Sequence, residues 1–170
     1  DLLPSESNLP GCHYQGDVMD IIEDGWDLMV AHPPCTRLAN SGVRWFSNPP
    51  RGKTHGEMLD GLFDAADFYK KLRAANIPKK CIENPVMHRY AKRLIEIESR
   101  QIVQPWWFGE KTFKATGYEL HGQSELKPTN KLIPPKRGTK EHKEWSWIHM
   151  ASPSTDRWKL TSRTPVGIAN

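Results

Sequence analysis

The stretch WDLMVAHPPC, residues 26–35, decides which fold the sequence predicts. It begins with an apolar run of strand length, which is typical of a strand covered on both faces in a parallel sheet. Two prolines end this run and stiffen the backbone in front of Cys35. The sequence therefore predicts a buried strand whose carboxyl end presents a cysteine from a rigid loop.

The segments that follow complete a strand, helix, strand unit. Apolar residues recur at spacings of three and four between residues 55 and 75, which predicts an amphipathic helix. A short apolar step then ends at Glu83, where Pro85 disfavours a helix. Because parallel strands end at the same edge of an open α/β sheet, Cys35 and Glu83 are expected to face a shared crevice. The predicted apolar face of the helix consists of Met58, Leu59, Leu62, Phe63, Ala66, Tyr69 and Leu72.

The remaining segments are shorter. The pattern predicts a helix over 87–95 and strands within 101–109 and 115–122. At 170 residues the chain fits one domain, 1–170. Within it we expect a catalytic core over 1–116, a basic loop region over 117–145 that could recognise a target, and a C-terminal return segment over 146–170.

Composition narrows the class of protein. No apolar run approaches the roughly 18 residues that a membrane-spanning helix needs. The chain has 3 cysteines without the spacing of a disulfide framework, which favours a reducing, cytoplasmic setting. Residues 1–85 carry 9 Lys/Arg against 12 Asp/Glu, whereas residues 86–170 carry 15 against 8. The second half is therefore where phosphate contacts are expected, with a solvated basic face as the alternative.

Cys35 is the candidate nucleophile. A thiol on a stiff loop can add to an electrophilic carbon when nearby positive charge favours the thiolate. Arg37 and Arg44 are close enough in sequence to supply that charge. One alternative is a small, inert residue at the end of a strand. The other is a zinc site, for which the available ligands are His32, Cys35, Cys12 and His13.

Glu83 is the candidate proton donor. It ends an apolar strand, which is a poor place for an unpaired carboxylate unless something binds it. A partly desolvated glutamate holds its proton more tightly, which suits donation to a ring nitrogen. The alternative is an exposed loop glutamate.

The motifs HPPC (32–35) and IENP (82–85) resemble the Pro-Cys and Glu-Asn motifs of cytosine-5 DNA methyltransferases. The sequence resembles the small phage and prophage DNA cytosine methyltransferase-like proteins more closely still. The shared pieces span nearly the whole chain and are GDV, GWDLM-AHPPCT-LA-SG, ENP-MHRYAK, QPW-FG, KAT, PTN and RT-GIA. The resemblance implies a Rossmann-like three-layer α/β sheet of the S-adenosylmethionine-dependent methyltransferase type.

The resemblance also implies residue roles. Cys35 would attack carbon 6 of a cytosine in DNA, and Glu83 would protonate ring nitrogen 3. Carbon 5 would then take a methyl group from S-adenosylmethionine, with the base flipped out of the duplex. The partner is expected to be DNA, with RNA left open. The candidate substrate-binding residues are Pro34, Asn84, Pro85, Arg37, Lys111, Lys114 and Arg163, and the candidate cofactor-binding residues are Asp1, Asp17 and Pro33.

The sequence departs from the family pattern at both ends. In the family a strand and a glycine loop that hold the cofactor precede the position of Asp1, and a helix follows the position of Asn170. The first strand and glycine loop are thus expected to be missing, and the chain to be a fragment with an incomplete cofactor site. A second function therefore stays open, a non-catalytic nucleic-acid or nucleotide-binding module that uses Lys, Arg and the tryptophans of QPWWFG and EWSWIHM.

Overall fold

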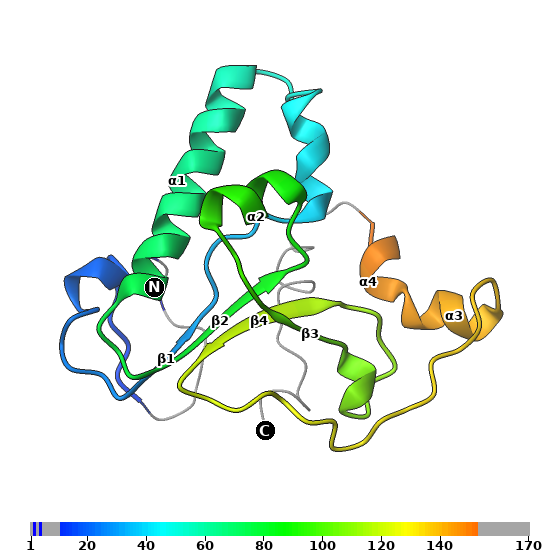
Figure 1. Ribbon diagram of the computed structural model, residues 1–170. Helices are drawn as coiled ribbons and strands as arrows, with labels where there is room; N and C mark the ends of the chain where they lie inside the picture. The colour runs from blue at the N-terminus through cyan, green and yellow to red at the C-terminus, as the bar shows by residue number, and fades with distance from the viewer. Residues whose placement is uncertain (1, 3, 5–10, 153–170) are drawn as a thin grey trace.

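The computed structural model describes residues 2, 4 and 11–152 and shows an α/β fold built on one four-stranded mixed sheet (Figure 1). The strands lie in the order β1-β2-β4-β3. The elements are η1 (Val18–Asp20), β1 (Leu28–Ala31), η2 (Asn40–Phe46), α1 (His55–Ala74), β2 (Lys79–Pro85), α2 (Arg89–Ile95), β3 (Gln101–Val103), η3 (Pro105–Trp107), β4 (Thr116–His121), α3 (Lys140–Trp145) and α4 (Trp147–Met150).

Strand direction sets where the ends of the sheet lie. β1 and β2 are parallel, whereas β4 is antiparallel to both of its neighbours, β2 and β3. The predicted strand, helix, strand unit is therefore confirmed, but the predicted parallel sheet is wrong because β4 runs in the opposite direction. Since β3 runs the same way as β2, the carboxyl ends of β1, β2 and β3 meet at one edge of the sheet.

Helix α1 begins where the sequence offers an N-terminal cap. Thr54 Oγ1 accepts a hydrogen bond from the backbone N–H of Glu57 at 3.2 Å, and the Glu57 carboxylate accepts one from the N–H of Thr54 at 2.8 Å. At the other end, the ammonium of Lys80 donates to the carbonyl oxygens of Arg73 (2.6 Å) and Ala75 (2.8 Å). Both ends of the helix thus have partners for their free backbone groups.

The predicted apolar face of α1 is confirmed for a narrower stripe than the sequence suggested. Leu59 is 47% exposed and Phe63 is 54% exposed. Each follows a buried residue by one position, which turns it about 100° around the helix axis and out of the contact. The residues of α1 that are buried are Met58, Leu62, Ala66, Tyr69 and Leu72.

The core lies between the sheet and the helices on one of its faces. α1 and α2 lie side by side over this face (Figure 1), and Ile82 of β2 packs fully buried beneath them. On the opposite face of β1, Leu28 is 50% exposed and Val30 is 58% exposed. The prediction that this strand is covered on both faces is therefore wrong for the described residues, because β1 is an edge strand packed on one side only.

The predicted boundary between a catalytic core over 1–116 and a loop region over 117–145 does not match the structure. Strand β4 lies inside the sheet and crosses the expected boundary between 116 and 117, so the sheet extends into the predicted loop region. Of the return segment over 146–170, residues 153–170 lie outside the described residues. No helix in the described part of the chain is long and apolar enough to cross a membrane.

A buried polar bridge joins α1 to β4. Glu119 is 7% exposed and accepts hydrogen bonds from the hydroxyl of Tyr69 (3.0 Å) and from Arg73 Nη2 (3.1 Å). The other oxygen of this carboxylate lies 2.6 Å from Arg73 Nε and 3.0 Å from His121 Nε2. Burial raises the pKa of Glu119, but the hydrogen bond and charge of Arg73 outweigh it and hold the pKa below its ordinary value.

Replacing Glu119 tests this bridge. Glu119→Gln should lower the free energy of unfolding at pH 7 by about 3 kcal/mol, because it leaves the partly buried Arg73 cation without its counter-charge. A lowered pKa in the folded protein stabilises it above the unfolded pKa, and that contribution disappears as the pH falls through the folded value. Urea unfolding should therefore show a smaller loss of stability in Glu119→Gln than in the parent between pH 7 and pH 3.

The matched control is Asp67→Asn on the same helix. It removes an exposed ion pair with Lys71 and should change the free energy of unfolding by less than about 0.5 kcal/mol. A Glu119→Gln protein as stable as the control variant at pH 7 would show that the bridge contributes nothing.

Candidate functional site

The register of β1 against β2 builds the candidate site. The last printed pair of the two strands is Ala31 with Ile82, and β2 then continues to Pro85. Residues that follow in the same parallel register are neighbours, so His32 comes beside Glu83. The next step places Pro33 beside Asn84, whose side-chain Nδ2 donates to the Pro33 carbonyl oxygen at 3.0 Å. The loop after β1, which contains Pro33, Pro34 and Cys35, therefore keeps the register of β1 against β2 for two further residues.

A buried histidine holds the second half of this loop. His88 is 3% exposed and its Nδ1 accepts from the backbone N–H of Ala91, which caps the amino end of α2. Because that nitrogen accepts, Nε2 carries the proton and donates to the Arg37 carbonyl oxygen at 2.7 Å. The backbone N–H of His88 also donates to the Leu38 carbonyl oxygen at 3.0 Å. One residue thus fastens the cysteine loop to α2.

The loop also closes on itself around Cys35. The carbonyl oxygen of Cys35 accepts from the backbone N–H groups of Leu38 (3.0 Å) and Ala39 (2.8 Å). A Cβ on Gly42 would lie 2.2 Å from the Thr36 carbonyl oxygen, so only glycine lets the chain pass there. The Cys35 side chain is half-buried at the end of this tight turn.

Three ionisable side chains come together at this edge. Burial raises the pKa of the Cys35 thiol, and the negative charge of Glu83 raises it further. A backbone hydrogen bond and the cation of Lys114 lower it in part. Burial also lowers the pKa of Lys114, against the effects of Glu83 and Cys35. Glu83 thus acts on both Cys35 and Lys114, and these two groups act on each other.

The cation near the thiol is not the one nearest in sequence. Arg37 packs along α1, where a Cβ on Gly61 would lie 3.3 Å from its Nε. Arg44 stacks over the ring of Trp45, with 4.4 Å between the guanidinium carbon and the ring centroid. Lys114, which precedes β4, is the cation that lowers the pKa of Cys35. Closeness to Cys35 in the sequence therefore did not identify the cation that acts on its thiol.

The coupling between Cys35 and Glu83 gives the site its chemistry. A thiol with a raised pKa is mostly protonated at neutral pH and is then a poor nucleophile. If the proton moves to the Glu83 carboxylate, the negative charge that disfavours the thiolate disappears. The same transfer makes Glu83 a proton donor. Thiolate attack and proton donation are therefore linked in this arrangement.

Two further polar residues lie near Glu83: His32, which the sequence analysis considered only as a zinc ligand, and Arg100, which it did not single out. His32 Nδ1 lies 2.9 Å from Glu83 Oε2. Arg100 is half-buried next to β3, and its Nη2 donates to the carbonyl oxygens of Asn84 (2.9 Å) and Gly117. Arg100 thereby joins the end of β2 to the start of β4. Neither residue has a local sequence signal, since one depends on strand register and the other on strand pairing.

The other predicted residues lie as follows. Pro34 and Lys111 are exposed, and Pro85 is paired with Thr116 of β4. Asp17 caps η1, where its Oδ1 accepts from the backbone N–H of Met19 at 3.0 Å. Two predicted residues, Asp1 and Arg163, lie outside the described residues.

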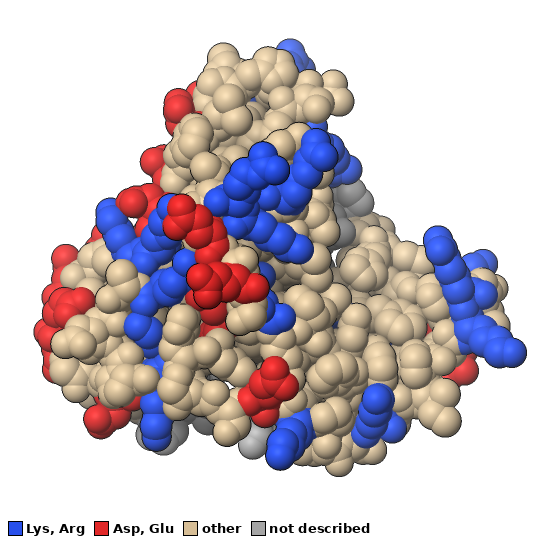
Figure 2. All heavy atoms as spheres, viewed as in Figure 1, with Lys and Arg blue, Asp and Glu red and all other residues tan. Residues whose placement is uncertain are grey.

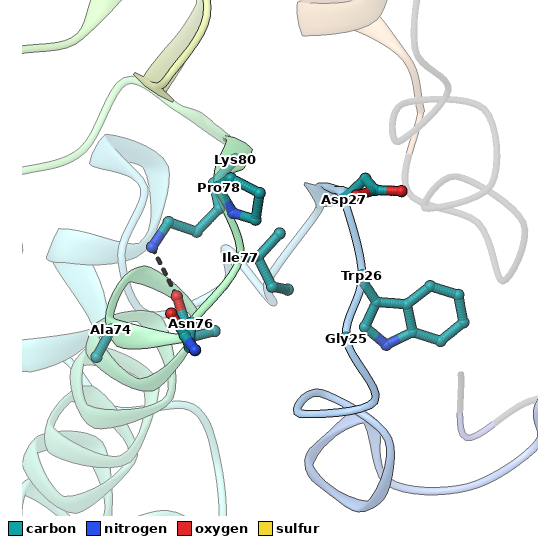
Figure 3. Close-up of a pocket in the computed structure, with 9 residues that line it drawn as sticks. Gly25, Trp26, Asp27, Ala74, Asn76, Ile77, Pro78 and Lys80 are labelled. Atoms are coloured by element: carbon teal, nitrogen blue, oxygen red, sulfur yellow. Dashed lines mark hydrogen bonds between the residues drawn. The ribbon is translucent and has the colours of Figure 1, made fainter.

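Two hollows of the described structure lie away from this edge. One, of about 660 Å³, lies at the amino ends of β1 and β2, at the opposite edge of the sheet, with Trp26, Asp27 and Pro78 in its wall (Figure 3). The other, of about 200 Å³, is apolar and lies between η1 and β1. Neither has Cys35 or Glu83 in its lining. Neither of these two hollows therefore belongs to the candidate site.

Comparison with known proteins adds no assignment. No protein-family model matches the sequence, and no curated protein matches it significantly. Within residues 2, 4 and 11–152, no group of three or more His, Cys, Asp or Glu side chains could hold a metal ion. The candidate site is therefore defined by its own geometry.

Charge changes around Cys35 should change its reactivity. Lys114→Met should slow alkylation of Cys35 by iodoacetamide at pH 7 roughly fivefold, because the thiol loses the cation that lowers its pKa. Glu83→Gln should accelerate it by a similar factor, because the thiolate loses an anionic neighbour. Peptide mapping by mass spectrometry measures the rate at Cys35 separately from those at Cys12 and Cys81.

Lys53→Met is the matched control, since Lys53 is an exposed lysine that pairs with Glu57 at the start of α1. It should leave the rate at Cys35 unchanged. Equal rates in Lys114→Met and Lys53→Met would mean that Lys114 does not influence the thiol.

Proposed function

We propose that the chain acts on cytosine in DNA as a cytosine-5 methyltransferase-type protein, with Cys35 as nucleophile and Glu83 as proton donor. The observation that carries this proposal is the coupling of Cys35, Glu83 and Lys114 at the carboxyl edge of β1 and β2. A thiol next to a carboxyl group is the pair that addition to carbon 6 of a pyrimidine requires. The resemblance of the HPPC and IENP motifs supports the same reaction and a Rossmann-like methyltransferase sheet.

The proposed chemistry begins with one proton transfer and one new bond. The Cys35 thiolate forms a bond to carbon 6 of the ring, and the double bond between carbons 5 and 6 breaks. The electron pair moves through the ring while the Glu83 carboxyl group delivers its proton to nitrogen 3. Carbon 5 becomes nucleophilic and can take an electrophile. Loss of the carbon 5 proton to solvent then expels the thiolate, and nitrogen 3 releases its proton to solvent, so that Glu83 has to be protonated again.

S-adenosylmethionine is the methyl donor that the resemblance implies, and when bound it would supply the electrophilic methyl group. The described residues do not fit the whole of this cofactor. The 200 Å³ hollow beside η1 is smaller than the roughly 300 Å³ at which pockets for such ligands begin. Asp17 Oδ1 already caps η1, and the Pro33 carbonyl oxygen already accepts from Asn84. The steps assigned to Cys35 and Glu83 therefore end at the activated carbon 5.

The surface supports a polyanionic partner. Figure 2 shows Lys and Arg side chains gathered over α2, whose exposed cations are Arg89, Lys92 and Arg93. α2 follows β2 directly and is fastened to the cysteine loop by His88. Cations placed beside the reactive edge suit the phosphates on either side of a base that has left the stack.

A covalent trap tests the proposed chemistry. If a methyl group reaches carbon 5, a DNA duplex that carries 5-fluorocytosine, incubated with the chain and S-adenosylmethionine, yields a protein–DNA adduct on a denaturing gel. Fluorine cannot leave carbon 5 as a proton does, so the thiolate is not expelled. Cys35→Ser should lose the adduct, Glu83→Gln should reduce it at least 100-fold by the loss of its proton donor, and Cys12→Ser should retain it.

Release of tritium from duplex DNA that carries 5-tritiated cytosine tests the addition step alone. Addition at carbon 6 lets carbon 5 exchange its hydrogen with water, and this needs no methyl donor. Tritium release without an adduct would place the chemistry at cytosine but exclude methyl transfer. If a protein that binds DNA gives no adduct and releases no tritium, the proposal is contradicted.

A nucleic-acid-binding module without catalysis is the second candidate function. The raised pKa of Cys35 and the cations of α2 favour it. It predicts salt-dependent DNA binding that Lys92→Met weakens and Cys35→Ser leaves unchanged. It also predicts no covalent adduct and no release of tritium.

A further inference from the structure

The contact between His32 and Glu83 has no role in the chemistry described so far. His32 Nδ1 lies 2.9 Å from Glu83 Oε2, and the two residues come from neighbouring strands. The side chain of His32 is 47% exposed, whereas that of Glu83 is 15% exposed. The imidazole therefore contacts both the nearly buried carboxylate and the solvent.

The backbone holds this contact in place. β1 and β2 are hydrogen-bonded up to the pair Ala31 and Ile82, one position before His32 and Glu83. One position after them, Asn84 donates to the carbonyl oxygen of Pro33. His32 is thus fixed on both sides, and Pro33 limits the freedom of its backbone. A ring so placed keeps the same nitrogen on the carboxylate.

The proposed chemistry creates a need for proton supply at Glu83. Glu83 gives a proton to the pyrimidine ring and needs one before each attack, yet its own side chain has little contact with water. Imidazole can accept a proton at one nitrogen and release another from the second. Since Nδ1 lies on Glu83, the other nitrogen is the one that exchanges with water.

We propose that His32 relays protons between solvent and Glu83. A proton from water binds Nε2 of His32, and the proton on Nδ1 passes to Glu83 Oε2, which restores the carboxyl group and the neutral imidazole. No electron transfer or co-reactant is involved. This inference rests on the proposed function for its use in catalysis, while the exchange itself depends only on the His32–Glu83 contact. His32 is a positioning residue, because it acts on the ring through Glu83.

Other charged and titratable groups set the field around the pair. Glu83 interacts electrostatically with residues from the loop after β1, from β2, from the segment before β3, from the segment before β4, and from β4 itself. These are Cys35, Cys81, Arg100, Lys114 and Tyr118.

Thiol alkylation tests the exchange without any DNA substrate. The rate at Cys35 follows its thiolate and should rise tenfold per pH unit if no neighbour changes charge. A positive charge gained by His32 would lie against Glu83 and offset the negative charge that disfavours the thiolate, so the logarithm of the rate should follow two parallel lines offset roughly threefold between pH 5 and 8. His32→Asn should follow a single line, because an amide keeps a hydrogen-bond donor near Glu83 but does not titrate.

The control for this measurement is His149→Asn, which removes an exposed histidine in α4 and should keep the offset. A single straight line in the parent protein, or an offset that survives in His32→Asn, would overturn the proposed exchange.

Imidazole rescue tests the relay during catalysis. His32→Ala should release tritium from 5-tritiated cytosine at least tenfold more slowly than the parent at pH 7, and added imidazole should restore most of that rate. A residue that only holds Glu83 in place would not be replaced by a freely diffusing base. Glu83→Gln should not respond to imidazole.

The two failures are distinguishable. Tritium release that is unchanged in His32→Ala would overturn the relay and leave the proposed function intact. If the parent releases no tritium, the proposed function is overturned together with the use of the relay in catalysis, and the alkylation offset decides whether a change of charge at His32 reaches Glu83 and Cys35.

Discussion

The parallel pairing of β1 with β2 is the constraint on which the candidate site depends. Its register fixes which residue of the proline loop lies beside which residue of the Glu83 segment. A slip of one residue would turn Glu83 to the other face of the sheet. The contacts that prevent a slip, Asn84 with Pro33 and His88 with Arg37, each join β2 or the start of α2 to the loop that follows β1. The loops therefore fix the register as much as the strands do.

The sequence predicted the elements that depend on local pattern. The spacing of apolar residues located α1, and the proline after Asn84 located the end of β2. The expectation that Cys35 and Glu83 meet followed from one general property of parallel strands. These predictions succeeded because each rests on a periodicity or a backbone restriction that neighbouring residues encode.

The predictions that failed concern relations between distant segments. An apolar run such as that of β1 does not reveal that its strand lies at the edge of the sheet with Leu28 and Val30 exposed. The alternation of β4 is the same for either strand direction, so its reversal had no signal. Arg100 acts on backbone carbonyl groups, which every residue possesses, and so leaves no partner in the sequence to recognise.

The raised pKa of Cys35 disfavours a nucleophile at rest, yet it follows from the arrangement that the proposed chemistry uses. Glu83 disfavours the thiolate only while it is ionised, and the proposed reaction needs it protonated. A free site therefore holds an inert thiol next to a carboxylate, which limits alkylation and oxidation of an accessible cysteine. Proton transfer to Glu83 removes the inhibiting charge and creates the donor in one step. Under this reading the same carboxyl group restrains the nucleophile at rest and assists it when a pyrimidine is bound.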